Sequence, residues 1–173
     1  VVTSNEAFFL EALPRQCLVV GGGYIAVEFA GIFRGLGVDT TLSYRGPLFL
    51  RNFDIDIRKT VMEEIEKKNI CLQFDSNVTS ITKLENGRLQ VDFAEGSQIE
   101  TDLILYATGR EPNIKDIGIE NVDVKLRNDG SIIVDENFRT SVDNIFALGD
   151  VTGGMQLTPV AIGEAMKLAS NLF

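Results

Sequence analysis

The feature that most constrains the fold of this chain is a short apolar run that leads into a glycine-rich turn and then into a helical pattern. Cys17–Val20 is uninterrupted in its apolar character, which is typical of a strand buried on both faces of a parallel sheet. Glycines occupy positions 21–23, and Tyr24–Leu36 is then dense in Ala, Ile, Phe and Val. This order predicts a strand–turn–helix unit of a parallel α/β sheet.

The glycine turn has the spacing Gly21-x-Gly23-x-x-Ala26, and each small residue has a physical purpose there. Gly21 permits a tight turn, Gly23 permits a pyrophosphate to approach the backbone, and Ala26 permits close packing of helix on strand. A pyrophosphate at this place meets the N–H groups and the positive end of the helix. We therefore predict dinucleotide binding, the alternative being a merely tight turn. Tyr24 and Ile25 open the helix, where they either cover a ring of the ligand or pack in the ordinary way.

The residues at the end of the second strand indicate which nucleotide binds. NAD-binding proteins place Asp or Glu there, about 20 residues past the glycines, to accept from the ribose 2′-hydroxyl. This chain has Tyr44-Arg45, with Arg51 close behind, and it has no acidic residue between Asp39 and Asp54. A guanidinium cannot accept a hydrogen bond, but its fork suits a 2′-phosphate. NADP(H) is therefore the better interpretation, the alternative being two solvated loop arginines.

Three further side chains are weaker candidates. Glu28 is the single carboxylate of an apolar stretch, residues 25–30; if buried, it needs a cation or donor, so it either forms a structural pair or lies beside the nicotinamide. Asp150 follows an apolar run and can accept from a ribose or polyol hydroxyl. Thr158 precedes proline, which predicts a helix with Thr158 as its N-cap and a second positive helix end.

The remaining pattern predicts two regions, residues 1–111 and 112–173. In the first region we expect a helix over Ser4–Leu13, strands over Val38–Tyr44, Ile70–Phe74 and Leu103–Tyr106, a helix over Asp54–Lys68, and an antiparallel meander over Val78–Ile99. In the second region we expect loops, a turn at Asp129-Gly130, strands over Ile132–Val134 and Ile145–Leu148, and a helix over Pro159–Leu172.

Composition excludes several kinds of function. The 173 residues contain no histidine, so catalytic systems and zinc sites that need histidine are excluded. The net charge of −9 argues against nucleic-acid or anionic-membrane partners. Cys17 and Cys71 are far apart, which predicts buried free thiols in a reducing compartment. With no signal peptide or long apolar run, we expect a cytoplasmic protein, and because the chain opens with Val1 rather than Met, we expect it to be part of a longer one.

Several segments together resemble the glutathione-reductase group of the class I pyridine nucleotide-disulfide oxidoreductases. The segments that carry this resemblance, in chain order, are Gly21–Gly31, Arg45 with Arg51–Asp54, Ala107–Asn113, Ile133–Asp135, and Ala147–Val151 with Leu157–Ile162. The resemblance covers nearly the whole chain. It implies a Rossmann-like NADP(H)-binding domain over residues 1–111, and a central segment over residues 112–173 that returns to the FAD-binding domain.

The resemblance also implies an activity and a set of site residues. NADPH would reduce FAD, FAD would reduce a redox-active disulfide, and the resulting dithiol would reduce glutathione disulfide. Arg45 and Arg51 would bind the 2′-phosphate, Tyr24 would be the lid over the nicotinamide–flavin site, and Glu28 and Arg110 would flank that site. The cofactor-binding residues so implied are Gly21, Gly23, Tyr24, Ile25, Ala26, Glu28, Arg45, Arg51, Thr108, Gly109, Arg110, Asp150 and Thr158, of which Asp150 and Thr158 would contact FAD.

The chain departs from the family pattern in two respects. It has neither the C-x-x-x-x-C pair nor any histidine, and the family places these in an N-terminal FAD-binding half and a C-terminal interface domain, the latter forming a homodimer. We therefore expect the chain alone to bind NADP(H) without reducing disulfides and to expose apolar surface. The alternatives are a trypanothione-reductase-like or other NADPH-dependent disulfide reductase, and a non-catalytic NADP(H)-binding module. Arg45 opposes an NAD-linked enzyme of the lipoamide type.

Overall fold

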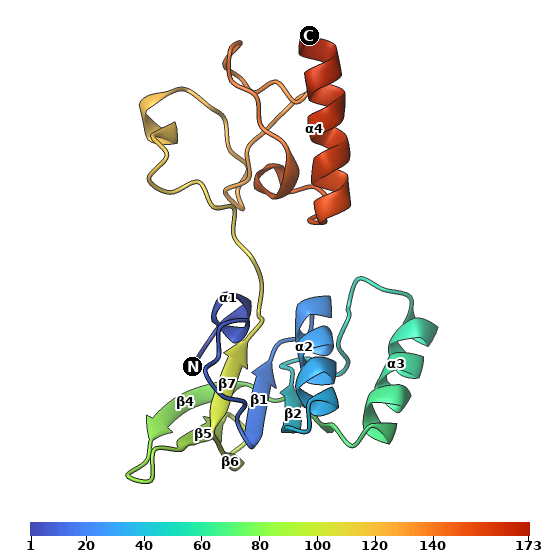
Figure 1. Ribbon diagram of the computed structural model, residues 1–173, viewed down its shortest axis with the longest axis vertical. Helices are drawn as coiled ribbons and strands as arrows, with labels where there is room; N and C mark the ends of the chain where they lie inside the picture. The colour runs from blue at the N-terminus through green and yellow to red at the C-terminus, as the bar shows by residue number, and fades with distance from the viewer. The chain divides into compact units, whose positions relative to one another are not determined.

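The computed structural model describes residues 1–173 as two compact units, Val1–Gly109 and Arg110–Phe173 (Figure 1). The division falls close to the end of the predicted first region at residue 111. Each unit has its own packing and is described by itself below.

The first unit is built on a four-stranded parallel sheet with the strand order β3-β2-β1-β7. Two helices, α2 and α3, connect β1 to β2 and β2 to β3. The elements are β1 (Gln16–Val20), α2 (Tyr24–Gly35), β2 (Asp39–Ser43), α3 (Ile55–Lys67), β3 (Cys71–Gln73) and β7 (Leu103–Tyr106). The predicted α/β alternation and Rossmann-like parallel sheet are therefore confirmed.

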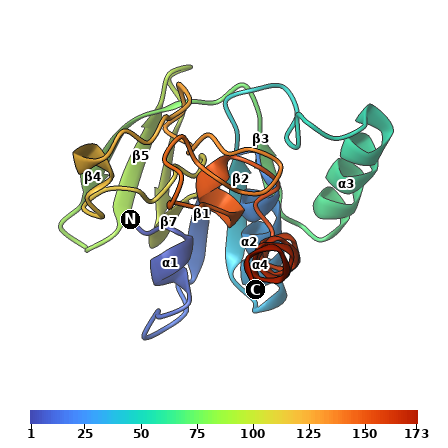
Figure 2. The same cartoon turned by 90° about the horizontal axis from the view of Figure 1, so that it is seen from above.

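The segment between β3 and β7 forms a separate antiparallel sheet with the order β4-β5-β6. Its strands are β4 (Val78–Lys83), β5 (Leu89–Phe93) and β6 (Gln98–Thr101). The predicted antiparallel meander is therefore present, and its turns place Gly87 and Gly96 in the left-handed region at φ of 83° and 89°. In both Figures 1 and 2 this meander lies on the opposite side of the parallel sheet from α3.

The two faces of the parallel sheet are buried against different partners. Val19 and Leu105 point to the helical side and belong to one apolar cluster with Phe29 of α2. The alternate residues Leu18 and Ile104 belong to a second cluster with β5 of the meander. Burial on both faces explains why β1 and β7 read as uninterrupted apolar runs in the sequence.

A polar cluster joins the meander to the parallel sheet. The Arg88 guanidinium, just before β5, lies 3.0 Å from a carboxylate oxygen of Glu100 and 3.3 Å from one of Asp102. It also donates to the side chain of Gln16, the first residue of β1. Asp102 in turn accepts from the Gln16 backbone N–H at 2.9 Å. These bonds fix the start of β1 relative to β5 and β6.

The N-terminal helix is shorter than the sequence pattern predicts. Helix α1 spans only Ser4–Ala7, and its N-cap is Thr3. Thr3 and Glu6 form a capping box, in which the Thr3 hydroxyl accepts from the Asn5 N–H and the Glu6 carboxylate accepts from Thr3. The apolar residues that extended the predicted helix to Leu13 lie beyond its end.

The two cysteines differ in exposure, which corrects the expectation of two buried thiols. Both are free, and Cys17 in the centre of the sheet is buried, but Cys71 is exposed. Cys71 begins β3, which is an edge strand of the parallel sheet and therefore has a neighbour on one side only. Burial raises the pKa of the Cys17 thiol to about 12.

The second unit contains two 3₁₀ helices and one long helix. These are η1 (Ile119–Asn121), η2 (Gly149–Thr152) and α4 (Thr158–Leu172). The strands predicted over Ile132–Val134 and Ile145–Leu148 are not formed: each segment makes only an isolated bridge, Leu126 to Ile132 and Arg139 to Phe146. A strand needs a continuous ladder of paired residues, whereas the backbone hydrogen bonds of these segments go to several different segments and build only isolated bridges.

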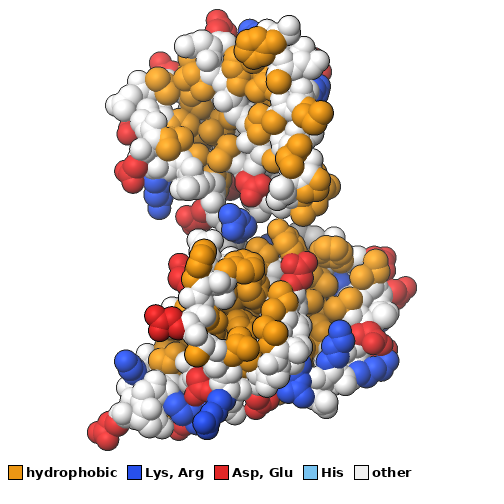
Figure 3. All heavy atoms as spheres, in the orientation of Figure 1, with side chains coloured by type: hydrophobic (Ala, Val, Ile, Leu, Met, Phe, Trp, Pro, Cys, Tyr) orange, Lys and Arg blue, Asp and Glu red, His pale blue; other side chains and the backbone are white.

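The start of α4 also differs from the prediction. Leu157 is the N-cap, and Thr158 is the first helical residue with Pro159 after it. Thr158 therefore does not cap the helix. None of the helices in residues 1–173 combines the length and apolar character needed to cross a membrane. Apolar side chains do lie on the visible surface of each unit, as Figure 3 shows, and Met166 of α4 is 70% exposed.

Candidate functional site

The candidate site of the first unit lies where the strand order of the parallel sheet reverses, between β1 and β7. Chain segments leave these adjacent strands at Gly21 and Ala107, and the Ala107 N–H donates to the Val20 carbonyl at 2.8 Å. In open parallel sheets, ligands bind outside the carboxyl ends of the strands at such a reversal. The fold therefore brings the glycine turn to the position that suits a nucleotide.

Gly21 is required at this place by the protein's own backbone. Its φ is 151°, and a Cβ atom there would lie 2.3 Å from the carbonyl oxygen of Ala107. The same Cβ would lie 3.2 Å from the Cβ of Ala26, which is fully buried. The Gly21 N–H donates to the Ser43 carbonyl at the end of β2. Gly21 and Ala26 thus permit the close approach of strands and helix that the sequence predicts.

Gly23 is different, because nothing in the protein requires a glycine there. It has φ of −88° and ψ of 175°, and a Cβ atom would meet no protein atom within 4 Å. Gly23 is the N-cap of α2 and provides no side-chain cap for the helix. The first turn of a helix leaves N–H groups without helical acceptors. Open space beside an uncapped helix start fits a pyrophosphate, so the residues present suit a bound dinucleotide.

The two arginines of the candidate site lie on the segment between β2 and α3. Arg45 and Arg51 are both exposed, and neither forms an ion pair or donates a hydrogen bond within the chain. Their guanidinium groups are thus available to an anion from solution. The ring of Tyr44 fixes the start of the segment by packing against Gly22 and Gly46, where added Cβ atoms would lie 2.3 Å and 2.8 Å from it.

The middle of this segment is joined to the glycine turn. The Leu50 N–H donates to the Gly22 carbonyl at 2.6 Å. Phe49 is fully buried, and its ring centroid lies 5.7 Å from that of Phe74. Sequence reasoning missed the parts played by Gly22 and Leu50. The presence of a glycine at the middle position of the 21–23 run was the only available signal.

The start of α2 exposes some of the predicted residues and narrows the alternatives for one of them. Tyr24 is 39% exposed and Ile25 is half-buried. Glu28 is exposed and forms no ion pair, so of the two alternatives for this carboxylate the structural pair is not formed. Phe29 and Ala30 supply the buried face at this level of the helix. Successive helix residues are separated by about 100°, which turns Glu28 away from that face.

Thr108 and Gly109 follow β7 and complete the candidate site of the first unit. Both are exposed, and Gly109 has φ of 153° with open space at its Cβ position. Arg110 is also exposed and is the first residue of the second unit.

The second unit positions its two candidates through contacts between η2 and α4. Gly149 has φ of 71°, and its N–H donates to the Glu164 carboxylate of α4 at 2.7 Å. This bond fixes the first turn of η2, where Asp150 is exposed. Thr158 is exposed at the first turn of α4. Sequence reasoning missed Glu164, which no motif indicates.

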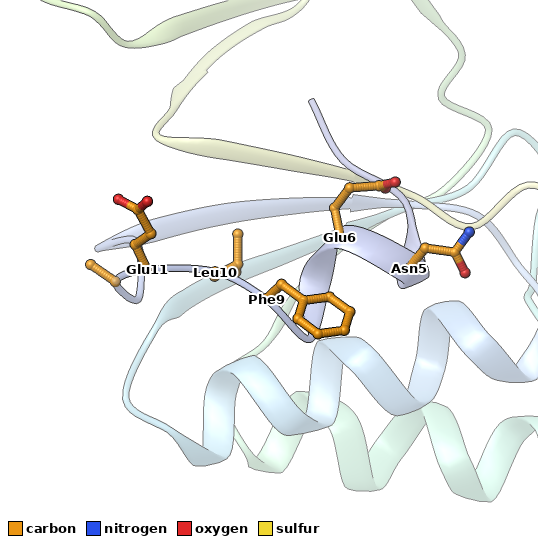
Figure 4. Close-up of a pocket in the computed structure, with 6 residues that line it drawn as sticks. Asn5, Glu6, Phe9, Leu10 and Glu11 are labelled. Atoms are coloured by element: carbon orange, nitrogen blue, oxygen red, sulfur yellow. The ribbon is translucent and has the colours of Figure 1, made fainter.

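A surface pocket elsewhere on the first unit contains none of the candidate residues. It is lined by Asn5, Glu6, Phe9, Leu10, Glu11 and Ala12 (Figure 4). Glu6 already accepts from the Thr3 N–H and hydroxyl at 2.7 Å and 2.6 Å, and the hydroxyl bond is the main cause that lowers the pKa of its carboxyl. The Glu6 carboxylate of this pocket is therefore already used in the capping box of α1. Nowhere in residues 1–173 do three His, Cys, Asp or Glu side chains gather as metal ligands.

Comparison with known proteins identifies the family. A family model described as pyridine nucleotide-disulphide oxidoreductase matches residues 1–165. The chain belongs to this family, whose members combine pyridine nucleotide and flavin chemistry. This confirms the resemblance of the sequence motifs.

Similar curated proteins are disulfide reductases. The chain is 42% identical over 173 residues to a glutathione reductase of Burkholderia cepacia, covering all of this chain and 38% of that protein. It is 45% identical over 176 residues to a trypanothione reductase of Leishmania donovani, covering 99% of this chain and 36% of that protein. The chain thus spans less than two-fifths of the length of these relatives.

Solved structures agree with the family assignment. The HOCl-induced flavoprotein disulfide reductase RclA from Escherichia coli superposes with a TM-score of 0.92 at 32% sequence identity. The superposition covers 99% of this chain and 39% of that one.

Proposed function

We propose that this chain is the NADP(H)-binding part of a flavin-dependent disulfide reductase. The observation that carries this proposal is the pair of unpartnered arginines, Arg45 and Arg51, on a segment bonded to the glycine turn. In a chain of net charge −9, two exposed guanidinium groups without acidic partners form a local cationic site. Such a site suits the 2′-phosphate that distinguishes NADP(H) from NAD(H).

In this proposal the parts of the dinucleotide are bound by different residues of the first unit. The pyrophosphate lies at the start of α2, over Gly21 and Gly23, where the helix dipole stabilises negative charge. Arg45 and Arg51 bind the 2′-phosphate. Tyr24 covers the nicotinamide–flavin site, and Ile25 packs beside it. Bound NADPH supplies the hydride for flavin reduction.

Other candidates contact the cofactors from the neighbouring segments. Glu28 is exposed on α2 and, in the proposal, flanks the nicotinamide together with Arg110. Thr108 and Gly109 line the nucleotide site at the end of β7. Asp150 and Thr158 of the second unit contact FAD, Asp150 as an acceptor for a ribityl or ribose hydroxyl and Thr158 at the positive end of α4.

The disulfide that we propose as substrate is glutathione disulfide. Relatives with similar identities to this chain include glutathione reductases, at 42%, and a trypanothione reductase, at 45%. The second candidate is the trypanothione-type substrate, because a trypanothione reductase is 45% identical to this chain. Both candidates would use the same NADPH chemistry on this chain.

Calorimetric titration of the chain with NADP⁺ and with NAD⁺ tests the nucleotide assignment. We expect NADP⁺ to bind at least about tenfold more tightly, because charge-assisted bonds to a phosphate are worth about 1.5 to 3 kcal/mol each. Equal dissociation constants for the two nucleotides would contradict the proposal, and so would an absence of binding by a chain whose circular dichroism shows it folded.

A further inference from the structure

The segment that carries Arg45 and Arg51 is irregular, yet one side chain of α3 bonds to its middle. The Arg58 guanidinium donates from Nη2 to the Leu48 carbonyl at 2.6 Å and from Nε to the Phe49 carbonyl at 2.8 Å. Arg58 is half-buried and forms no ion pair with a carboxylate. Its donors are therefore directed to main-chain oxygens.

These two carbonyls belong to Leu48 and Phe49, shortly before Arg51, so bonds to them affect the path of the backbone at Arg51. The next residue, Leu50, has φ of 56° and donates its N–H to the Gly22 carbonyl at 2.6 Å. Three consecutive residues, 48–50, are thus fixed by polar bonds on two sides, from α3 and from the glycine turn. Arg51 follows at once, so the direction of its backbone depends on both bonds.

We propose that Arg58 is a positioning residue for the 2′-phosphate site, and this rests on the proposed NADP(H) function. Arg58 holds the Leu48 and Phe49 carbonyls, so that Arg51, and through the same segment Arg45, face the phosphate in one geometry. Positions held within about half an ångström are what strong, directional phosphate recognition needs. Arg58 itself does not touch the nucleotide in this account.

A merely structural role for Arg58 makes a different prediction. Phe49 is fully buried, so in a purely structural role Arg58 would do no more than hold that ring in the core. In that case its loss would weaken the whole first unit and reduce the affinity for NADP⁺ and NAD⁺ alike. A positioning role for the phosphate site reduces the affinity for NADP⁺ and spares NAD⁺, which lacks the phosphate.

The chain offers a matched control in Arg34. It too donates from its guanidinium to a main-chain carbonyl, that of Lys68, at 2.9 Å. Arg34 lies in the last turn of α2, at the opposite end of the helix from Gly23. Arg34→Ala therefore removes the same charge and the same kind of bond without touching the segment that carries Arg45 and Arg51.

The experiment measures dissociation constants for NADP⁺ and NAD⁺ by calorimetry on the whole chain and its variants. We expect Arg58→Ala to weaken NADP⁺ about tenfold and NAD⁺ by less than about twofold, because two hydrogen bonds that orient the segment are lost. Arg58→Lys, which keeps donors without the planar fork, should restore part of the NADP⁺ affinity. Arg34→Ala should leave both constants unchanged.

A double variant adds a readout that a structural role would not produce. In an Arg51→Ala background, Arg58→Ala should weaken NADP⁺ by much less than it does alone, because both substitutions disable the same contact. Fully additive losses would overturn the positioning role. If Arg58→Ala fails to fold, Arg58→Lys decides: NADP⁺ and NAD⁺ affinities that fall by equal factors overturn the inference.

Failure of this inference is distinguishable from failure of the proposed function. If the unmodified chain shows no preference for NADP⁺, the assignment of Arg45 and Arg51 to a 2′-phosphate is wrong, and the inference about Arg58 is wrong as well. If the unmodified chain prefers NADP⁺ but Arg58→Ala leaves the preference unchanged, only the role of Arg58 is overturned.

Discussion

The backbone N–H of Leu50 donates to the carbonyl oxygen of Gly22 at 2.6 Å, and so connects the two loops that we assign to the nucleotide. Gly22 belongs to the turn after β1, and Leu50 to the segment after β2. Because the two loops share this bond, the groups for the pyrophosphate and for the 2′-phosphate are held on one connected backbone. We therefore expect the geometry of the proposed pyrophosphate site and that of the proposed 2′-phosphate site to depend on each other through this bond.

Alanine should destabilise the protein far more at Gly21 than at Gly23, the two outer glycines of the turn. Gly21→Ala places a Cβ 2.3 Å from the Ala107 carbonyl oxygen at φ of 151°, and we expect it to lower the free energy of unfolding by about 2 to 4 kcal/mol. Gly23→Ala meets no protein atom within 4 Å, and we expect a loss of about 1 kcal/mol or less. Denaturant unfolding measures both values.

Nucleotide binding completes this comparison. A methyl group at position 23 occupies the space that we assign to the pyrophosphate, so Gly23→Ala should weaken both NADP⁺ and NAD⁺ at least about tenfold. Unchanged affinity in a folded Gly23→Ala variant would remove the pyrophosphate from this turn.

Cys17 makes the stability of the first unit depend on pH in the alkaline range. Burial raises the pKa of its thiol from 9.0 to about 12. The unfolded chain releases this proton above pH 9, whereas the folded chain retains it to about pH 12. The free energy of unfolding should therefore fall as the pH rises between these values, and the contribution of Cys17 should be complete below pH 9.

Denaturant unfolding at pH 8 and at pH 10 measures this effect. Cys17→Ala should show a smaller loss of stability between the two pH values than the unmodified chain does. Cys71→Ala is the matched control, because Cys71 is exposed, and its pH dependence should equal that of the unmodified chain. Equal pH dependence for Cys17→Ala as well would show that the Cys17 thiol ionises in the folded state.

Arg88 should matter more to stability than an ordinary surface ion pair. It contacts Glu100, Asp102 and Gln16 and so joins the meander to β1. Arg88→Ala should lower the free energy of unfolding by about 1 to 2 kcal/mol, because it leaves partly buried acceptors without a donor. Lys67→Ala removes a simple helix-surface pair with Glu64 and should have no measurable effect. Equal effects would contradict a joining role for Arg88.

The sequence was sufficient to predict features that depend on residues close together in the chain. The predicted strand Leu103–Tyr106 coincides with β7, and the predicted helix Tyr24–Leu36 exceeds α2 by one residue. Apolar runs, glycine spacing and helix boundaries depend on the local backbone conformation. The order of these elements then predicts a parallel sheet with right-handed crossovers. The position of the glycine turn follows from that order.

Features that depend on distant partners were not predictable. The bond of Leu50 to Gly22 joins two main-chain groups, and the Arg58 guanidinium donates to the Leu48 carbonyl; no motif pairs these residues. The apolar segment 132–134 has the composition of a strand, yet it forms only one isolated bridge, from Ile132 to Leu126, and no ladder. The apolar neighbours of Glu28 left open whether this carboxylate is buried, because neighbours in a helix face different directions.

The most direct test of NADP(H) binding through Arg45 and Arg51 is to remove both arginines and measure the affinity for NADP⁺. In Arg45→Ala/Arg51→Ala, two charge-assisted contacts of about 1.5 to 3 kcal/mol each are lost, so NADP⁺ affinity should fall by about two to four orders of magnitude. Calorimetry should find NAD⁺ affinity nearly unchanged, and Arg34→Ala should leave both nucleotides unaffected. Equal affinity for NADP⁺ in the double variant and the unmodified chain would contradict the assignment of this chain to NADP(H).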